Sequence, residues 1–182
     1  MNKVCVFFGT GFEEIEALTV VDLLRRAAID VSMVSITGEK RVESSHKIWV
    51  EMDMLIEEVD FSQVNMIVLP GGMPGTKNLE ACQLLMEQIE KFHEEGKYLS
   101  AICAAPSIFG HRGMLKGKSA CSYPDFESHL EGAQVTRNPV EIAGNIITSR
   151  GMGTAIEFGL AIVARMKDEE TAKELSKKII YG

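Results

Sequence analysis

The chain has 182 residues, the length of one ordinary domain, and we treat residues 1–182 as a single unit. Apolar residues make up 46% of it, enough to bury a sizeable core, and the net charge of −7 argues against nucleic acid or an anionic membrane as a partner, because both require a basic face. No window approaches the roughly 20 apolar residues of a membrane span, and the first residues lack the cleavage site of a signal peptide, so we expect a cytoplasmic protein.

Strands and a helix are predicted to alternate through the first third of the chain. Residues 3–8 are an unbroken apolar run, typical of a strand that is buried on both faces. Residues 13–28 place apolar side chains at helical spacing, with Ile15 as the first of them. A second strand is predicted over residues 30–37. Apolar and polar residues alternate over residues 40–54, which predicts a β-hairpin. This order is the beginning of an α/β fold.

The same alternation continues through the middle of the chain. Residues 65–72 predict a strand that ends in a pair of glycines, and residues 76–96 predict one long amphipathic helix closed by its final glycine. Residues 97–103 predict the next strand, and residues 105–115 predict a short helix.

The last third predicts short strands and then two helices. The strands lie within residues 118–122, 133–138 and 144–151, and the helices span 153–168 and 169–180. Because strands alternate with helices and several strands are wholly apolar, we predict a mainly parallel sheet with helices on both faces. Ligands of such folds bind beyond the carboxyl ends of the strands, so we expect a site at that edge of the sheet.

Cys103 stands at one of three segments expected to meet at that edge, the others being residues 9–16 and 70–75. It follows a buried strand and precedes Ala104 and a turn into a helix. A helix N-terminus lowers the pKa of a cysteine, and a sharp turn lifts its side chain clear of the backbone. We therefore predict that Cys103 is a reactive thiol. The alternative is a buried structural cysteine, a common fate of this residue.

The other three cysteines are expected to be structural. Cys5 falls within a strand, Cys82 within the long helix and Cys121 at a strand end. No two cysteines are spaced as CxxC, which argues against a zinc site or a disulfide framework. We expect free thiols, and we expect neither a metal nor an organic cofactor.

The segment "GTGFEEIEA" resembles a nucleotide-binding loop only superficially. The third glycine of GxGxxG is replaced by Glu14, and the acidic residues here would repel a phosphate. Glu13 and Glu14 are explained by the helix dipole, which favours carboxylates in a first turn. Glu16 lies one turn further, among apolar residues, where burial would keep its proton. A protonated Glu16 could donate a hydrogen bond to a Cys103 thiolate.

The segment "VLPGGMPGT" offers bare backbone N–H groups after a strand. Such groups could form an oxyanion hole, although a plain tight turn explains the glycines equally well. Three histidines carry weaker signals. His93 is expected at a solvated helix end, whereas His111 and His129 fall in or near short helices, and each is more readily explained as structural than as catalytic.

Together these motifs make the sequence recognisable. It resembles the ThiJ/PfpI superfamily, in the branch of the parkinsonism-associated protein deglycase and bacterial YajL. The resemblance runs nearly end to end and rests on "GFEEIEA" with "VDLLRRA", on "IVLPGG", on "AICAAP" and on "TSRGMGTAIEFGLAIV". Four motifs in this order are specific.

The resemblance implies a flavodoxin-like three-layer sandwich that usually forms a homodimer. It marks Cys103 as the reactive cysteine and Glu16 as its protonated hydrogen-bond partner. It also implies that the backbone N–H groups of Gly72 and Ala104 surround the reacting oxygen.

Further residues follow from the same resemblance. Arg26 matches an arginine that helps shape the site near the dimer contact, and His46 occupies a loop position where relatives often carry arginine that reaches into the partner's pocket. The protease-like branch has histidine where this chain has Ala104, which disfavours an amidase or protease. The deglycase branch often has histidine where this chain has Tyr123, which can donate a hydrogen bond but is a poor base near neutral pH.

Three functions remain open on the sequence. The first is an enzyme that acts on small reactive carbonyls or their adducts, with a Cys103 thiolate as nucleophile and Glu16 as proton shuttle. The second is a redox sensor or stress chaperone in which Cys103 is oxidised. The third is a role in thiazole metabolism, which the superfamily name suggests and which no residue here supports.

Overall fold

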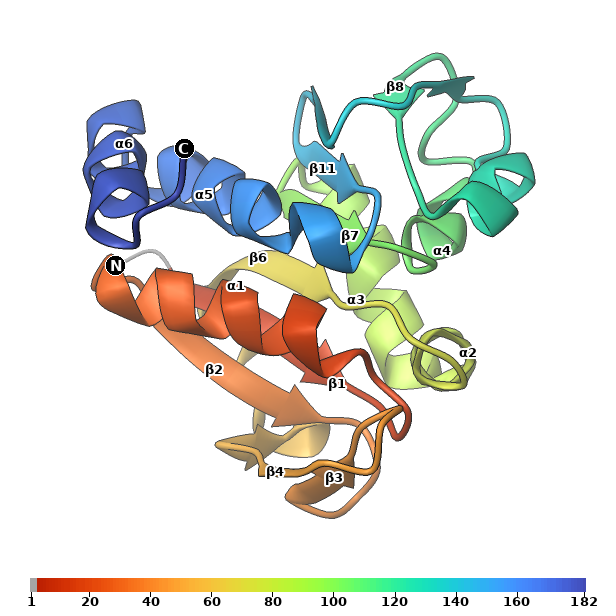
Figure 1. Ribbon diagram of the computed structural model, residues 1–182. Coiled ribbons are helices and arrows are strands. Elements are labelled where there is room, and N and C mark those ends of the chain that lie inside the picture. Colours follow the sequence, from red (N-terminus) through yellow and green to blue (C-terminus); the bar gives the residue numbers. More distant parts are fainter. Residues whose placement is uncertain (1–2) are drawn as a thin grey trace.

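A seven-stranded sheet forms the centre of the molecule, which is described over residues 3–182 of a computed structural model (Figure 1). The strand order is β10-β11-β7-β6-β1-β2-β5, and neighbours are parallel except β10, which is antiparallel to β11. This is the flavodoxin-like arrangement that we expected. The strands span Lys3–Phe8 (β1), Asp30–Ser35 (β2), Met54–Leu55 (β5), Val64–Leu69 (β6), Tyr98–Ile102 (β7), Val140–Ala143 (β10) and Ile146–Ser149 (β11).

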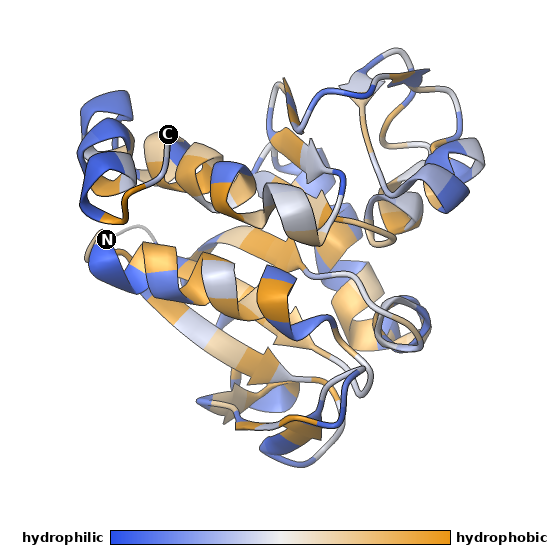
Figure 2. Ribbon diagram, in the orientation of Figure 1, coloured by the Kyte–Doolittle hydropathy of each residue, from blue (hydrophilic) through white to orange (hydrophobic). Residues whose placement is uncertain are grey.

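Two hydrophobic cores lie on the two faces of this sheet. Along β1, Val4, Val6 and Phe8 enter one core, and Cys5 and Phe7 enter the other, because successive side chains of a strand point to opposite faces. Figure 2 shows the strands mostly hydrophobic and the outer sides of the helices hydrophilic. The first core is covered by α1 (Glu14–Arg26), α5 (Ala155–Met166) and α6 (Glu169–Lys178), the second by α2 (Gly75–Ala81), α3 (Gln83–Glu94) and α4 (Pro106–His111).

Helix α1 differs from its predicted pattern in its first turn. Ile15 was expected on the buried stripe but is 48% exposed, whereas Glu14 and Glu16 are 6% and 1% exposed. The apolar stripe is established only from Ala17 onward. The first turn lies beyond the sheet edge, where loops rather than apolar strands cover it, and there the two carboxyl groups find hydrogen-bond partners.

The single long helix predicted over residues 76–96 is wrong, because α2 and α3 are separate. Cys82 has an extended ψ of 100° and joins the two helices instead of lying within one. The amide of Asn78 donates to Thr10 C=O (2.8 Å), which ties α2 to the loop after β1. Leu85 of α3 instead packs into the core on the sheet face. The two helices are therefore held by different contacts, and the chain bends between them.

The remaining elements are short. The hairpin predicted over residues 40–54 is present as the antiparallel pair of β3 (Arg41–Glu43) and β4 (Trp49–Glu51). Strand β10 was not predicted, because this four-residue edge strand is only partly apolar. In residues 3–182, no helix is long and apolar enough to cross a membrane. The other short elements are β8 (Ser119–Ala120), β9 (Gln134–Val135), and the 3-10 helices η1 (Ile56–Glu58), η2 (Phe61–Gln63), η3 (Pro124–His129) and η4 (Met152–Thr154).

Candidate active site

The loops after β1 and β6 meet at the carboxyl end of the sheet, as the sequence predicts. Glu13 N–H donates to Gly71 C=O (2.9 Å), and Gly75 N–H donates to Gly11 C=O (3.2 Å). These backbone bonds fix the start of α1 against the glycine-rich turn. The side chain of Glu16 is thereby carried to the end of β7, where Cys103 lies.

Cys103 sits in a sharp turn between β7 and α4. Its φ of 65° is in the left-handed region, which a non-glycine residue seldom adopts. Its N–H donates to Ser149 C=O (3.0 Å), and its C=O accepts from Tyr123 N–H (2.8 Å). The backbone is thus held from two sides in the geometry of a nucleophile elbow, with the side chain only partly buried.

Gly71 separates Cys103 from Glu16 without a side chain of its own. A Cβ at this position would lie 2.6 Å from Cys103 Cβ, 2.7 Å from Glu16 Oε2 and 3.1 Å from Cys103 Sγ. Gly71 N–H also donates to Glu16 Oε2 (2.9 Å). Only glycine permits this approach. Gly72 was singled out from the sequence and Gly71 was not, although both stand in "VLPGG".

The protonation of Glu16 follows from its burial. Burial raises the pKa of Glu16 from 4.5 to about 7, although hydrogen bonds with the Cys103 thiol and with Gly71 N–H oppose the increase. The carboxyl group therefore holds a proton over part of the neutral range, in the direction that the sequence analysis expected. The charge of Glu13 contributes in the same sense as burial.

The lowered pKa predicted for Cys103 is not what the structure gives. Burial, the negative charge of Glu16 and the hydrogen bond to Glu16 raise the pKa of the Cys103 thiol to about 12. Backbone hydrogen bonds from Ala104 and Gly72 act in the opposite direction. Burial, followed by the charge of Glu16, outweighs these two contacts. Protonation of Glu16 removes the negative charge that opposes a thiolate, so the titrations of the two groups are coupled.

The two backbone N–H groups that we expected around the site do contact the sulfur. They belong to Gly72 and Ala104. Gly72 has a φ of 91°, and a Cβ there would collide with the backbone N of Glu13, so a glycine is required. Donors that contact the sulfur also lie close to an oxygen of a group bound to it, which is the placement an oxyanion hole needs.

Tyr123 and Glu16 both lie close to Gly151. A Cβ added at Gly151 would lie 3.6 Å from the Tyr123 ring and 3.9 Å from Glu16 Oε1. The ring of Tyr123 and the carboxyl group of Glu16 thus flank the same glycine. Gly151 was not singled out from the sequence, although it stands in the motif "TSRG" that carries the resemblance.

His46 and Arg26 do not reach Cys103 within this chain. His46 Nδ1 lies 2.8 Å from Glu14 Oε1 at the start of α1, and this hydrogen bond raises the pKa of His46. Arg26 lies in the last turn of the same helix, where Nε is 2.6 Å from Asp22 Oδ2. The positions predicted for both residues near a dimer contact stay predictions.

Glu13, Glu14 and His46 form the cluster in residues 3–182 that could hold a metal ion. One ligand atom from each lies within 4.8 Å of the others. The same atoms already have partners, because Glu13 caps α1 through Ile15 N–H and Glu14 pairs with His46. Burial opposes ionisation of Glu14, but hydrogen bonds from its own N–H, His46 and Ser44 lower its pKa.

The remaining cysteines and histidines have other surroundings. Cys5 and Cys121 are buried, and burial raises their pKa values to about 12 and about 11. His93 is half-buried with an unbonded Nδ1, so the predicted solvated position is wrong. His111 and His129 hydrogen-bond to each other through Nε2 and Nδ1 (3.0 Å).

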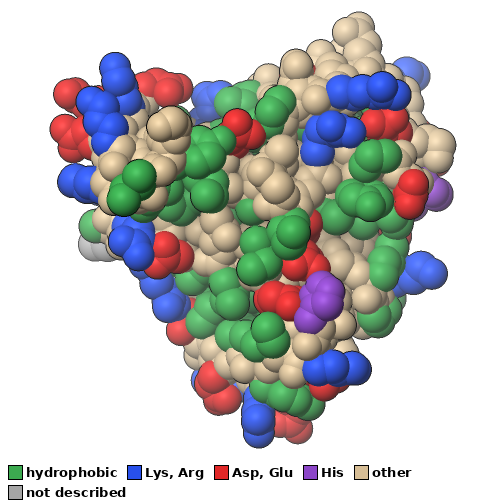
Figure 3. All heavy atoms as spheres, in the orientation of Figure 1, with side chains coloured by type: hydrophobic (Ala, Val, Ile, Leu, Met, Phe, Trp, Pro, Cys, Tyr) green, Lys and Arg blue, Asp and Glu red, His purple; other side chains and the backbone are tan. Residues whose placement is uncertain are grey.

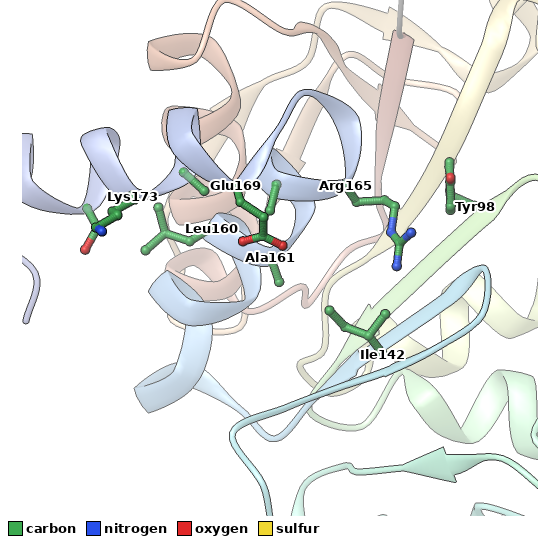
Figure 4. Close-up of a pocket in the computed structure, with 10 residues that line it drawn as sticks. Tyr98, Ile142, Leu160, Ala161, Arg165, Glu169 and Lys173 are labelled. Carbon is green, nitrogen blue, oxygen red and sulfur yellow. The ribbon is translucent and has the colours of Figure 1, made fainter.

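A well-formed cavity of about 490 Å³ lies away from this chemistry (Figure 4). It is lined by α5, α6, β10 and Tyr98, with Arg165 over the Tyr98 ring at 5.6 Å. Tyr98 begins β7 and Cys103 follows its last residue, so the two lie at opposite ends of the strand. The location of the reactive groups, rather than the size of a cavity, therefore defines the candidate site.

Comparison with known proteins identifies the family. Residues 2–165 match the DJ-1/PfpI family. The chain belongs to this family. It is 33% identical over 179 residues to Protein dj-1beta of Drosophila melanogaster, which covers 97% of this chain and 96% of the relative. It is 37% identical over 181 residues to Protein DJ-1 homolog B of Arabidopsis thaliana, covering 98% of this chain but only 41% of the length of that relative.

Two further members of the DJ-1/PfpI family bear on function. Oxidized DJ-1 of Toxoplasma gondii has a TM-score of 0.95 and 32% identity, with 100% of both chains covered. The glutathione-independent glyoxalase DJR-1.2 of Caenorhabditis elegans is 29% identical over 168 residues, covering 92% of this chain and 89% of the relative. The resemblance expected from the four sequence motifs is confirmed.

Proposed function

We propose that this chain is a cofactor-independent enzyme that converts small reactive carbonyls, or their adducts with amines and thiols, into hydroxy acids. The observation that carries the proposal is the contact of Cys103 with Glu16, whose pKa burial raises to about 7. An acid that titrates near neutral pH can both donate and accept a proton during one turnover. A relative that bears the name glyoxalase supports the same chemistry.

The reaction begins with the addition of sulfur to carbon. With a 2-oxoaldehyde, Cys103 Sγ bonds to the aldehyde carbon, and the carbonyl oxygen takes a proton to give a hemithioacetal. Glu16 then removes the proton from that carbon and returns one to the neighbouring carbon, which leaves a thioester of a 2-hydroxy acid. Water cleaves the thioester and restores the thiol. For a free 2-oxoaldehyde the sum is one carbonyl compound plus one water giving one hydroxy acid, and an adduct releases its amine or thiol as well.

The backbone donors fit the charge that develops. Oxygen gains negative charge during addition and during hydrolysis, and the N–H groups of Gly72 and Ala104 are placed to donate to it. Removal of one such donor typically costs about a hundredfold in rate or more. Tyr123 would supply a hydrogen bond where the deglycase branch often has a base.

Lactate formation from methylglyoxal tests the proposal. We expect wild type to form lactate and Cys103→Ala to form none above the rate without protein. Cys82→Ala is the matched control, because Cys82 is the other partly buried cysteine and lies between α2 and α3. Equal rates for wild type and Cys103→Ala would refute the proposal.

We also propose that two copies of this chain form a dimer. Apolar side chains gather on one face over the start of α1 and the β3–β4 hairpin (Figure 3). Light scattering should give twice the chain mass of 20.0 kDa, and Trp49→Asp should halve it, whereas Ile142→Asp on β10 should not. A monomer in wild type would refute it. The exposed apolar residues of these two segments are Ile15, Ile48 and Trp49, which are 48% to 51% exposed.

A redox-sensing role is the second candidate. A sulfinate on Cys103 would accept hydrogen bonds from Gly72, Ala104 and a protonated Glu16, the same donors that the enzyme needs. The solved relative from Toxoplasma gondii is described as oxidized. Peroxide treatment followed by peptide mass spectrometry should show a gain of about 32 Da on Cys103 before any other cysteine. No lactate together with this gain would favour sensing over turnover.

A further inference from the structure

An open cavity of about 630 Å³ lies beside the candidate site, between the start of α2 and η3. It begins within one residue of the sulfur-binding turn, because Met73 follows Gly72 directly. Its other wall is also attached to the turn. Tyr123 N–H donates to Cys103 C=O, and Phe126 N–H donates to Tyr123 C=O (both 2.8 Å). A substrate held at Cys103 could therefore extend into this cavity.

The lining of this cavity favours an anion. Met73, Pro74 and Phe126 supply apolar surface, and Lys77 and His129 supply the polar groups. No carboxylate lines the cavity, and Lys77 forms no ion pair with any residue from 3 to 182. A small apolar floor with two nitrogen donors fits a short chain that ends in a carboxylate.

His129 is held by a hydrogen-bonded relay that ends at Glu80. Glu80 Oε1 lies 2.7 Å from His111 Nδ1, and His111 Nε2 lies 3.0 Å from His129 Nδ1. A carboxylate only accepts, so His111 Nδ1 donates to it. When a hydrogen also lies on His111 Nε2, it donates to His129 Nδ1, and the hydrogen of His129 then lies on Nε2, the atom left to donate to a ligand.

The inner end of the relay is held by Glu80. Arg112 Nη1 lies 3.6 Å from the same Glu80 oxygen and helps to hold that carboxylate in position. The Phe126 ring packs against His129 with centroids 5.7 Å apart, which fixes the imidazole at the cavity wall.

We propose that this cavity binds a carboxylate that forms part of the substrate, with Lys77 and His129 as specificity-determining residues and His111 and Glu80 as positioning residues. The proposal rests on the proposed function and names its substrate class. The preferred substrate is an adduct of a reactive carbonyl with a thiol or amine that itself carries a carboxylate, rather than the free dicarbonyl. Cys103 Sγ displaces the thiol or amine from the former aldehyde carbon of the adduct. The displaced group, whose carboxylate occupies the cavity, leaves with the proton of the Cys103 thiol.

Binding is tested without turnover. In the Cys103→Ala background, calorimetry compares N-acetyl-S-(2-oxopropyl)cysteine with its carboxamide, which differ only in the charged group. Since hydrogen bonds to charged groups are strong, we expect the acid to bind at least about tenfold more tightly. Lys77→Met and His129→Leu should each reduce this ratio to below about threefold. Lys91→Met on α3, which does not line the cavity, should leave the ratio unchanged.

The positioning residues are tested by kinetics with the hemithioacetals that methylglyoxal forms with N-acetylcysteine and with its carboxamide. Glu80→Gln should raise KM for the N-acetylcysteine hemithioacetal by about 10-fold or less and leave its kcat unchanged, because the substitution perturbs only the orientation of His129. The KM and kcat of the carboxamide hemithioacetal should not change. If Glu80 had a merely structural role, the substitution would change KM equally for both substrates.

Two results would overturn the proposal: equal binding of acid and carboxamide in Cys103→Ala, or a ratio that neither Lys77→Met nor His129→Leu changes. These results differ from a failure of the proposed function. If wild type forms no lactate but the binding ratio holds, the enzyme proposal fails and the carboxylate site stands. If lactate forms but the ratio is close to one, only the carboxylate site fails.

Discussion

Replacement of Glu16 by glutamine should lower the pKa of Cys103. Glu16 Oε2 and Cys103 Sγ both lie within 3.1 Å of the position that a Cβ on Gly71 would take, so they are less than about 6 Å apart. At an effective dielectric constant of about 20, a unit charge at about 6 Å contributes about 2.8 kcal/mol. Loss of that charge should therefore lower the pKa of Cys103 from about 12 to about 10.

The rate of iodoacetamide labelling between pH 6 and pH 11, read for each cysteine by mass spectrometry, measures this change. Cys5 and Cys121 serve as internal controls, because burial is the main reason for their raised pKa values and Glu16 is not among the causes. Their labelling profiles should be the same in wild type and Glu16→Gln. If the Cys103 profile stays in place or moves to higher pH, the charge of Glu16 is not what opposes the thiolate.

Three further predictions follow from the same contacts. Because the folded state holds the Glu16 proton to higher pH than the unfolded chain, the free energy of unfolding should fall by about 3 kcal/mol from pH 4.5 to above pH 7, and urea denaturation should show no such contribution in Glu16→Gln. Gly71→Ala should lower the free energy of unfolding by about 1–3 kcal/mol and displace Cys103. Gly153→Ala is the control, because a Cβ added at Gly153 has no atom within 4 Å. Equal melting temperatures for the two variants would contradict this prediction. Tyr123→His should raise kcat/KM for methylglyoxal, since histidine can act as a base near neutral pH, and an unchanged or lower value would show that no base is needed there.

The sequence was sufficient to predict a mainly parallel α/β fold and the edge of the sheet at which Cys103 and Glu16 lie. Unbroken apolar runs such as residues 3–8 have few alternatives to a buried strand, and strand ends in a parallel sheet must meet at one edge. Cys103 and Glu16 were both found in this way. The prediction of one long helix failed at Cys82, because a continuous helical pattern does not reveal that α2 is bound to the loop after β1 while α3 packs on the sheet.

Electrostatic properties were less accessible than positions. The turn at Cys103 was predicted to lower its pKa, but the outcome depends on how deeply Glu16 is buried and on the approach that Gly71 permits. Neither is local in sequence, since 55 residues separate Glu16 from Gly71. The pairing of His111 with His129 was likewise beyond the sequence, because the short strand predicted between α4 and η3 does not determine how these two helices lie relative to each other.

The contrast between Glu14 and Glu16 shows how one helix turn assigns two different protonation states. A helix N-terminus stabilises a carboxylate, and Glu14 conforms, because hydrogen bonds with its own N–H, His46 and Ser44 lower its pKa despite burial. Glu16 points instead toward Gly71, where burial outweighs its two hydrogen bonds and raises its pKa to about 7. The side of the helix on which each carboxyl group lies therefore decides its charge. Proton transfer to and from carbon requires an acid that titrates near neutral pH, and Glu16 meets that requirement whereas Glu14 does not.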